Sequence, residues 1–211
     1  MSNKIKSIFT NKEIIQKIQD KLPKLFQLAE IDNSRDGKLG MEVGSARERI
    51  IIAMLIYTFG QENINTNIPI TEKETDVIIF DEPISIKTFT NKRVVGVKLI
   101  WSVDAEKALY FKTSYVPECD ILLVHINWNA KGALYLIPKE AQLEVLNSMG
   151  RDKYFKLPVA GTNSRGVEIT NIAINKLVIN SLSKKIEIDW IRKENANYNQ
   201  YDRWVDLWSE K

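Results

Sequence analysis

Two stretches before Gly60 carry apolar residues at the three- and four-residue spacing of a helix. The first runs from Lys12 to about Ala29, with apolar positions at Ile14, Ile18, Leu22 and Leu25. Pro23 lies inside this stretch and is expected to kink or divide the helix, because proline lacks an amide hydrogen and clashes with the preceding turn. After a predicted loop over 31–40, a second helix begins near Ser45 and ends at Gly60. Its broad apolar face indicates packing against a sheet.

Three strand-like segments with short connections follow, at 76–80, 84–88 and 94–101. The turn-like sequence Asp81-Glu82-Pro83 separates the first two segments. The three segments therefore predict a three-stranded meander. Ser102 is a candidate N-cap for a helix over 103–113, and a buried strand over 121–128 comes next.

The remainder of the chain alternates strands and helices. The pattern predicts strands at 133–137, 167–169 and 186–190, helices at 138–150 and 171–182, and a loop over 151–165. The tail over 198–208 carries Tyr201, Trp204, Leu207 and Trp208 at roughly helical spacing. Such a face typically packs on the body of the protein or on a second subunit. The elements together predict an α+β fold.

Length and composition agree with one folded domain over residues 1–211. The chain has 211 residues, of which 44% are hydrophobic and 27% are charged, so it is long enough and apolar enough for one sizeable core. The net charge of +3 results from 30 basic and 27 acidic residues. Because this balance favours a polyanion only mildly, binding of nucleic acid would require a local basic cluster.

Cysteine and histidine are too scarce for several kinds of chemistry. A single cysteine, Cys119, excludes an internal disulfide and a cysteine-based zinc site. The single histidine, His125, lies in an apolar run, where a structural role is expected. Enzymes built on Cys-His or Ser-His pairs are therefore disfavoured, and carboxylates and lysines are left for catalysis. No signal peptide or membrane span is visible, so we expect a cytoplasmic protein without a membrane partner.

Asp76 and Lys87 carry the candidate chemistry. Asp76 opens the run 76–80, and Lys87 closes the segment 84–87 eleven residues later. A β-hairpin would bring the carboxylate and the ammonium group to the same end of a sheet. There, a carboxylate can bind a hard cation such as Mg²⁺, and a lysine can orient a water or stabilise a phosphate under attack. The pattern indicates metal-dependent phosphodiester hydrolysis. Alternatively, Asp76 bonds a turn amide and Lys87 is a solvated residue at a strand end.

The order of elements from Ser45 to Trp128, with Asp76 and Lys87 on adjoining strands, resembles the core of the PD-(D/E)XK nucleases, particularly type II restriction endonucleases. The small size and the Asp-to-Ser-x-Lys arrangement resemble the ThaI-like group of these enzymes. The resemblance implies an α/β/α core over about 44–128, in which helices flank a central mixed β-sheet. Residues 129–211 would add elements for recognition and dimerisation.

The same resemblance implies roles for individual residues. Asp76 would bind the metal, the main-chain carbonyl of Ile86 would join its shell, and Lys87 would be the catalytic lysine. Ser85 stands where the family usually carries a second acid. Because a hydroxyl is a poor substitute for a carboxylate ligand, either the site has decayed or another acid supplies the charge.

Three glutamates are candidates for the missing acid. Glu48, in the helix that begins near Ser45, is the first choice, Glu42 is the second and Glu82 is the third. A structural alternative exists for Glu48, because Ser45-Ala46-Arg47-Glu48 matches a capping box, in which the glutamate bonds back to the helix start.

Two polar segments are candidates for DNA contacts. Thr90, Asn91, Lys92 and Arg93 follow the proposed lysine and suit the phosphates that flank a scissile bond. The loop 161–169 resembles base-reading segments of some restriction enzymes, with Arg165 suited to guanine and Asn163 to adenine. In both cases the alternative is an ordinary solvated loop.

The resemblance implies a Mg²⁺-dependent endonuclease that cuts double-stranded DNA at a specific sequence. Cutting both strands of a palindrome requires two sites related by a twofold axis, so a homodimer is expected. A DNA methyltransferase is the expected genetic partner. Two alternatives are a repair or junction-resolving nuclease of the same fold and a non-catalytic DNA-binding protein with a degenerate site.

Overall fold

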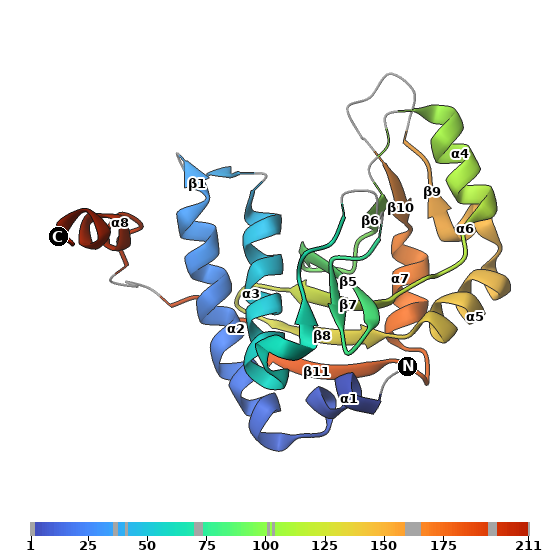
Figure 1. Cartoon of the computed structure of the whole chain (residues 1–211). Helices are drawn as coiled ribbons and strands as arrows, with labels where there is room; N and C mark the ends of the chain where they lie inside the picture. Colours follow the sequence, from blue (N-terminus) through green and yellow to red (C-terminus); the bar gives the residue numbers. More distant parts are fainter. Residues whose placement is uncertain are drawn as a thin grey trace.

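The computed structural model describes residues 3–35, 38–40, 42–69, 74–100, 102, 104–158, 166–193 and 198–210, without the side chains of residues 3, 35, 39 and 203. Within them, the largest sheet has the strand order β11-β8-β7-β5-β4-β3 (Figure 1). Its strands are β3 (Ile64–Asn65), β4 (Val77–Ile79), β5 (Glu82–Thr90), β7 (Asp120–Ile126), β8 (Lys131–Ile137) and β11 (Lys184–Asp189). β5 and β7 pair in parallel, and the other neighbours are antiparallel. The sheet is therefore mixed.

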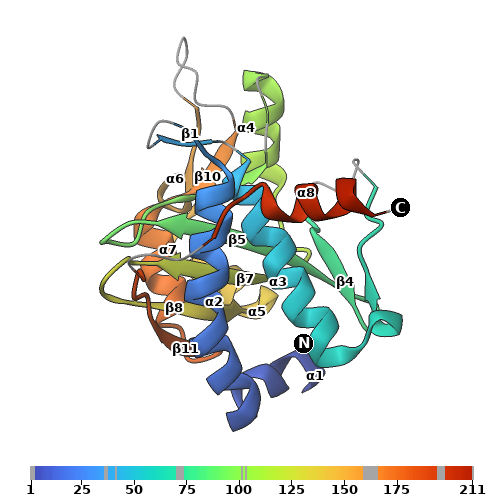
Figure 2. The ribbon, with the colours of Figure 1, turned by 90° about the vertical axis from the view of Figure 1, so that its left-hand side faces the viewer.

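One face of this sheet is covered by α1 (Asn3–Lys6), α2 (Lys12–Asp32) and α3 (Val43–Phe59), and α2 and α3 lie side by side in Figure 2. Phe26 of α2 and Leu55 of α3 are fully buried in the same apolar cluster as Ile86 of β5 and Val124 of β7. Burial of each such side chain contributes about 1.5–3 kcal/mol relative to its exposure. This packing orients α3 along β5.

The opposite face carries α4 (Ala105–Ser114), α5 (Lys139–Met149), α6 (Arg151–Tyr154), α7 (Asn171–Val178) and a smaller sheet. The smaller sheet has the order β6-β10-β9, formed by β6 (Val97–Ile100), β9 (Phe155–Lys156) and β10 (Val167–Ile169). Alternate residues of the central strands, such as Leu123 and Tyr135, pack against this layer. The fold is therefore α/β/α, with a mixed sheet between helices, as the sequence predicts.

The remaining elements lie at the periphery. They are short 3-10 helices at Ser7–Phe9 and Gln61–Asn63, a hairpin of β1 (Ser34–Arg35) and β2 (Lys38–Leu39), and α8 (Asp202–Ser209). In Figure 1, α8 stands off from the body beside the C-terminal half of α2. Within the described residues, no helix combines the length and hydrophobicity needed to cross a bilayer.

Two sequence signals set the limits of the long helices. Asn11 caps α2, because its side-chain oxygen accepts hydrogen bonds from the amides of Glu13 and Ile14 at 2.9 and 3.2 Å. Gly60 ends α3 with a φ of 86°, a conformation that glycine adopts without steric cost. Of the two outcomes expected at Pro23, a kink or a division, division is wrong, because α2 is continuous over 21 residues. Ile18, Leu22 and Phe26, on both sides of the proline, are buried in one core.

The predicted meander holds for two strands only. β4 and β5 form the expected antiparallel hairpin, but β6 pairs with β10 in the smaller sheet. β7 takes the place beside β5 instead, because all seven of its residues are buried and a parallel central strand needs apolar residues on both faces. Gly96 allows β6 to approach β10, since a Cβ atom there would lie 2.7 Å from the carbonyl oxygen of Ile169.

Local turn and cap assignments also change. The hairpin turn consists of Phe80 and Asp81, whose φ angles of 48° and 67° match a type I′ turn, and Pro83 lies within β5. Pro83 precedes Ile84, the first residue paired with β7, so its missing N–H disrupts no pairing there. Asp104, not Ser102, caps α4, because its carboxylate accepts hydrogen bonds from two amides of the first turn.

A buried ionic cluster joins α2 and α3 to the end of β11. Arg47 donates to one carboxylate oxygen of Glu30, and Trp128 donates to the same oxygen at 2.9 Å. Arg192 donates to the other oxygen at 2.5 Å, and its guanidinium lies over the Trp128 ring. Glu30 and Arg47 are only 3% and 5% exposed. Both oxygens of this carboxylate are therefore satisfied by protein donors, which limits the cost of burying it.

Candidate active site

Asp76 precedes β4 and faces β5. Its amide donates to the carbonyl of Ile84 at 2.9 Å. Its Oδ2 atom accepts hydrogen bonds from the Ser85 hydroxyl at 3.2 Å and from the Ile86 amide at 2.6 Å. Ser85 is fully buried, so these bonds hold the carboxylate in one orientation. Among the described residues, none donates a hydrogen bond to Oδ1, which remains available for a ligand.

Lys87 lies two residues after Ser85 on the same face of β5. Its Nζ atom is 3.2 Å from Oδ2 of Asp76, and the two side chains are 17% and 22% exposed. The hairpin register therefore brings the predicted acid and the predicted amine into contact. The Ile86 carbonyl shares the Asp76 side of the strand with the Ile86 amide, because the N–H and C=O of one strand residue point the same way.

Glu48 reaches the same place from α3. Its pKa lies above its ordinary value, mainly because of burial and then because of the negative charge of Asp76, whereas Lys87 and Arg49 act in the opposite direction. The capping-box alternative is wrong, since α3 begins at Val43 and Ser45 is already inside the helix. Among the described residues, none donates a hydrogen bond to Glu48.

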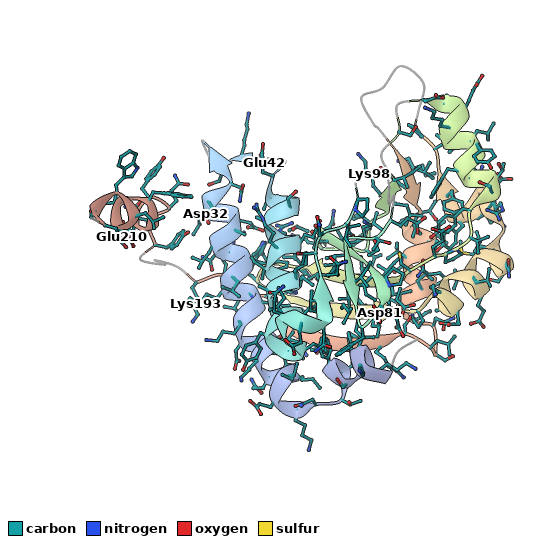
Figure 3. All side chains as sticks on the ribbon, in the orientation of Figure 1. Asp32, Glu42, Asp81, Lys98, Lys193 and Glu210 are labelled. Carbon is teal, nitrogen blue, oxygen red and sulfur yellow. The ribbon has the colours of Figure 1, made fainter. Side chains whose placement is uncertain are left out.

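The two other candidate acids lie elsewhere. Glu82 pairs with Ile79 beside the hairpin turn, three residues from Ser85 and thus about 10 Å away along β5. Glu42 precedes α3, about 9 Å along the helix axis from Glu48. Figure 3 shows Glu42 at the tip of α3. It also shows Asp81, which precedes Glu82 in the hairpin turn, well apart from Lys98 of the pocket. Of the three glutamates, the structure brings only Glu48 to Asp76 and Lys87 within the described residues.

A pocket of about 320 Å³ opens between α3, β5 and the start of β6. Glu48 and Lys87 both line it. The remaining lining residues are Gly44, Ile86, Thr88, Phe89, Gly96, Val97 and Lys98. The sequence did not single out Lys98, although its position on β6 places a second cation at this pocket. The pocket therefore combines an acid with two basic residues, a suitable lining for a phosphate with its metal ion.

The donors around the pocket fit a small hard cation. In the described part of the chain, no cluster of three or more histidine, cysteine or acidic side chains forms a complete metal cage. The set is instead two carboxylates, of Asp76 and Glu48, and the Ile86 carbonyl. All are oxygen donors, and Mg²⁺ typically binds one or two carboxylates and completes its shell with water and phosphate oxygens. A cation between the carboxylates would also offset the repulsion from Asp76 that, after burial, raises the Glu48 pKa.

The segment proposed to contact phosphates follows directly after the pocket residues Thr88 and Phe89 in the chain. Thr90 ends β5, and Asn91, Lys92 and Arg93 follow it in an exposed loop. The Asn91 side-chain oxygen accepts a hydrogen bond from the Arg93 backbone amide at 3.1 Å. The backbone amide of Asn91 donates to the Ile126 carbonyl, also at 3.1 Å. These bonds hold the loop near the end of β7. Asn163 and Arg165, the proposed base-reading residues, lie outside the described residues.

A second acidic group near the site was not found from the sequence. Glu74 is 8% exposed and accepts a hydrogen bond from the Tyr115 hydroxyl at 3.2 Å. Burial raises its pKa to about 7, and Lys87 is among the charges that lower it. Burial also raises the pKa of Cys119, beside Glu74, to about 12. The one sequence signal was the two-residue spacing of Glu74 and Asp76, which puts both on one face of an extended chain.

The expected structural role of His125 is confirmed. Its ring stacks on Phe89 with centroids 4.6 Å apart, and Nε2 lies 2.9 Å from the Asn91 carbonyl oxygen.

An acid and a lysine on adjoining strands of a mixed sheet, with a further acid from the helix packed on it, define a nuclease of the PD-(D/E)XK class. Comparison with known proteins gives the family. The family described as "Restriction endonuclease ThaI" matches residues 8–210, so the chain belongs to the ThaI restriction endonuclease family and is a site-specific nuclease.

A solved structure agrees with this family. A restriction endonuclease in complex with substrate DNA is 52% identical to this chain, with a TM-score of 0.90, and the match covers 98% of this chain and 99% of the other. No curated protein matches the chain.

Proposed function

We propose that this enzyme is a type II restriction endonuclease that hydrolyses both strands of double-stranded DNA at a specific sequence and requires Mg²⁺. The contact between Asp76 and Lys87, with Glu48 beside it at one pocket, is the observation on which the proposal depends. The DNA bound in the similar solved structure supports the choice of substrate.

Asp76, Glu48 and the Ile86 carbonyl would hold the metal ion in this proposal. When bound, Mg²⁺ would polarise the scissile phosphate and lower the pKa of an attacking water. The Ser85 hydroxyl and the Ile86 amide orient Asp76 through its Oδ2 atom. Ser85 therefore supports the metal-binding acid, and Glu48 supplies the second carboxylate that Ser85 lacks.

Lys87 would act on the nucleophile. Its ammonium group, 3.2 Å from Asp76, has further protons with which to orient a water for in-line attack and to stabilise charge on the phosphate. The exposed Thr90, Asn91, Lys92 and Arg93 would bind neighbouring phosphates and set the register of the duplex. Asn163 and Arg165 remain the proposed readers of base edges.

The assembly would be a homodimer. Each chain brings one set of Asp76, Glu48 and Lys87, so two copies related by a twofold axis would cut the two strands of a palindromic site. A companion DNA methyltransferase would protect host DNA at the same sequence.

The test is cleavage of plasmid DNA of mixed sequence by the purified protein with Mg²⁺, followed by sequencing of the fragment ends. A single sequence at all ends, and loss of cleavage in EDTA, would support the proposal. Ends without a common sequence, or cleavage confined to branched DNA, would reject it in favour of a repair or junction-resolving nuclease.

A further inference from the structure

An apolar groove of about 460 Å³ lies between α2 and α3. Ile14, Ile18 and Leu25 line it from α2, and Ile50, Ala53 and Met54 line it from α3. Ala53 is exposed, and Leu25 is 38% exposed, so the floor of the groove meets solvent. The charged residues that line the groove, Lys17 and Lys21, are both basic.

The C-terminal helix α8 carries an exposed apolar face that matches the apolar lining of the groove. Trp204, Val205 and Trp208 are 56%, 59% and 90% exposed, although apolar side chains of this size are usually buried. Asp202 and Asp206 of α8, and Glu210 directly after it, recur at four-residue spacing and so form an acidic row on the side opposite the tryptophans. Figures 1 and 3 show α8 and Glu210 well apart from the sheet and its flanking helices.

We propose that α8 of a second copy of this chain occupies the groove between α2 and α3, and that the two copies exchange their C-terminal helices reciprocally. This inference rests on the homodimer proposed above and names its interface. The tryptophans of α8 would enter the apolar groove, and the acidic row, which lies on the opposite side of the helix, would remain in contact with water.

The position of α8 in its own molecule favours a second copy as the partner. The Tyr198 hydroxyl donates to the Asp32 carboxylate at 2.7 Å, which ties the segment before α8 to the last turn of α2. A hollow lined by Tyr201 and Trp204 joins the groove at Leu25 and Ile50, which line both cavities. The groove therefore continues to Tyr201 and Trp204 at the start of α8, while the rest of α8 extends away from the body (Figure 1). A twofold axis near this point would place the helix of each copy over the groove of the other.

The area involved is sufficient for an interface. One aromatic side chain buries about 150–250 Å² when it is covered. Two tryptophans per helix, the groove residues beneath them and the reciprocal contact together reach on the order of 1,000 Å², which is the lower range of specific interfaces. Exchange also closes the assembly, because each copy offers one helix and one groove.

Cross-linking of single-cysteine variants of the full chain tests the exchange. Ala53→Cys places a thiol in the groove, and Val205→Cys places one on α8. The native Cys119 is 1% exposed and should not react. When the two variants are mixed and treated with a short bis-maleimide, we expect a covalent heterodimer, which each variant alone does not form. Ile179→Cys is the matched control for the groove position, because Ile179 is 81% exposed on the opposite layer, and it should give no product with Val205→Cys.

Three results would overturn the exchange. They are absence of the mixed product, equal product with the Ile179 control, and closure of the cross-link within one chain of an Ala53→Cys/Val205→Cys double variant. Analytical sedimentation measures the dimer affinity and, together with DNA cleavage, distinguishes failure of the helix exchange from failure of the proposed function. Under exchange, Trp204→Ser/Trp208→Ser weakens the dimer by about tenfold or more. A dimer that keeps its affinity in this variant and still cleaves plasmid DNA rejects the exchanged helix alone. A wild-type protein that sediments as a monomer and cleaves no DNA rejects both proposals.

Discussion

Arg47 and Glu48 are neighbours on α3, yet they belong to opposite kinds of charged cluster. Arg47 points into the interior, where Glu30 has hydrogen-bond donors on both carboxylate oxygens. Glu48 points to the pocket beside Asp76 and Lys87, where the described residues give it no donor, and where burial and then the like charge of Asp76 raise its pKa. A satisfied carboxylate stabilises the fold, whereas an unsatisfied one near another acid marks a place for a cation. Removal of a charge should therefore lower stability in the Glu30 cluster and lower activity in the cluster around Asp76.

The largest effect should come from Asp76→Asn. Loss of the charge removes the central proposed metal ligand, so we expect plasmid cleavage to fall by about a thousandfold or more, with thermal unfolding nearly unchanged. Asp81→Asn is the matched control, since Asp81 is an exposed aspartate of the same hairpin in a left-handed conformation that asparagine tolerates. Equal cleavage by the two variants would contradict the assignment of Asp76.

Lys87→Met should lower the rate of cleavage by about 10²–10⁴-fold, the range of a positioned acid–base or orienting group. The methionine keeps the length of the side chain, so Asp76 loses only its ionic partner and the fold should persist. Single-turnover cleavage measures the effect. The exposed Lys184 provides a control position on β11, and a Lys184→Met enzyme as slow as Lys87→Met would exclude a specific role.

Glu30→Gln should act on stability instead. It leaves the buried Arg47 without a counter-charge, and breaking a buried ion pair by removing one partner costs about 3–5 kcal/mol. Chemical denaturation should show this loss in the free energy of unfolding, while cleavage per folded molecule remains near that of the wild type. A stable but inactive variant would instead link this cluster to catalysis.

Glu48→Gln should have the smaller effect on activity that is expected of a second ligand. We expect the Mg²⁺ concentration for half-maximal cleavage to rise by about tenfold, because metal affinity depends on the charge of the ligands. Removal of a half-buried charge close to Asp76 should leave stability equal or slightly higher. An unchanged Mg²⁺ requirement would show that Glu48 does not bind the metal.

Asp120 is intermediate between Glu30, which has donors on both carboxylate oxygens, and Glu48, which has none among the described residues. Substitution of Asp120 should have the smallest effect on stability. Burial raises its pKa above the ordinary 3.8, although its carboxylate accepts a hydrogen bond from the Lys139 amide at 2.8 Å. A carboxyl group with a raised folded-state pKa contributes stability at low pH and loses it as pH rises through that pKa. The difference in unfolding free energy between the wild type and Asp120→Asn should therefore be more favourable to the wild type near pH 4 than near pH 7. A constant difference would contradict the raised pKa.

The sequence was sufficient to predict the parts of the site that depend on residues close together in the chain. Asp76 and Lys87 could be paired because two apolar strands and a short turn determine their separation, and the fold class followed from the order of the elements. Glu48 remained one of three candidates, since its proximity to Asp76 depends on how α3 packs on β5. Its capping-box alternative arose from a helix start misplaced by two residues.

Features that depend on distant contacts could not be found in the same way. The displacement of β6 depends on β10, about 70 residues later in the chain, and the alternation of apolar residues does not say which strand is the neighbour. Glu74 could be recognised as a perturbed acid only in the structure, where it is buried beside Tyr115. Burial of a polar side chain is a tertiary property, so periodicity alone does not reveal it.

The tight turn at Phe80 and Asp81 fixes the register of β4 against β5. Both residues have a positive φ, and the two-residue connection decides which side of the sheet every residue of β4 and β5 faces. One added or deleted residue there would swing Asp76 toward the α2 and α3 layer and leave Lys87 alone. A one-residue insertion at this corner, remote from the pocket, would therefore remove activity and also turn the buried Val77 and Ile79 out of their core, and natural variants that differ in length should leave it untouched.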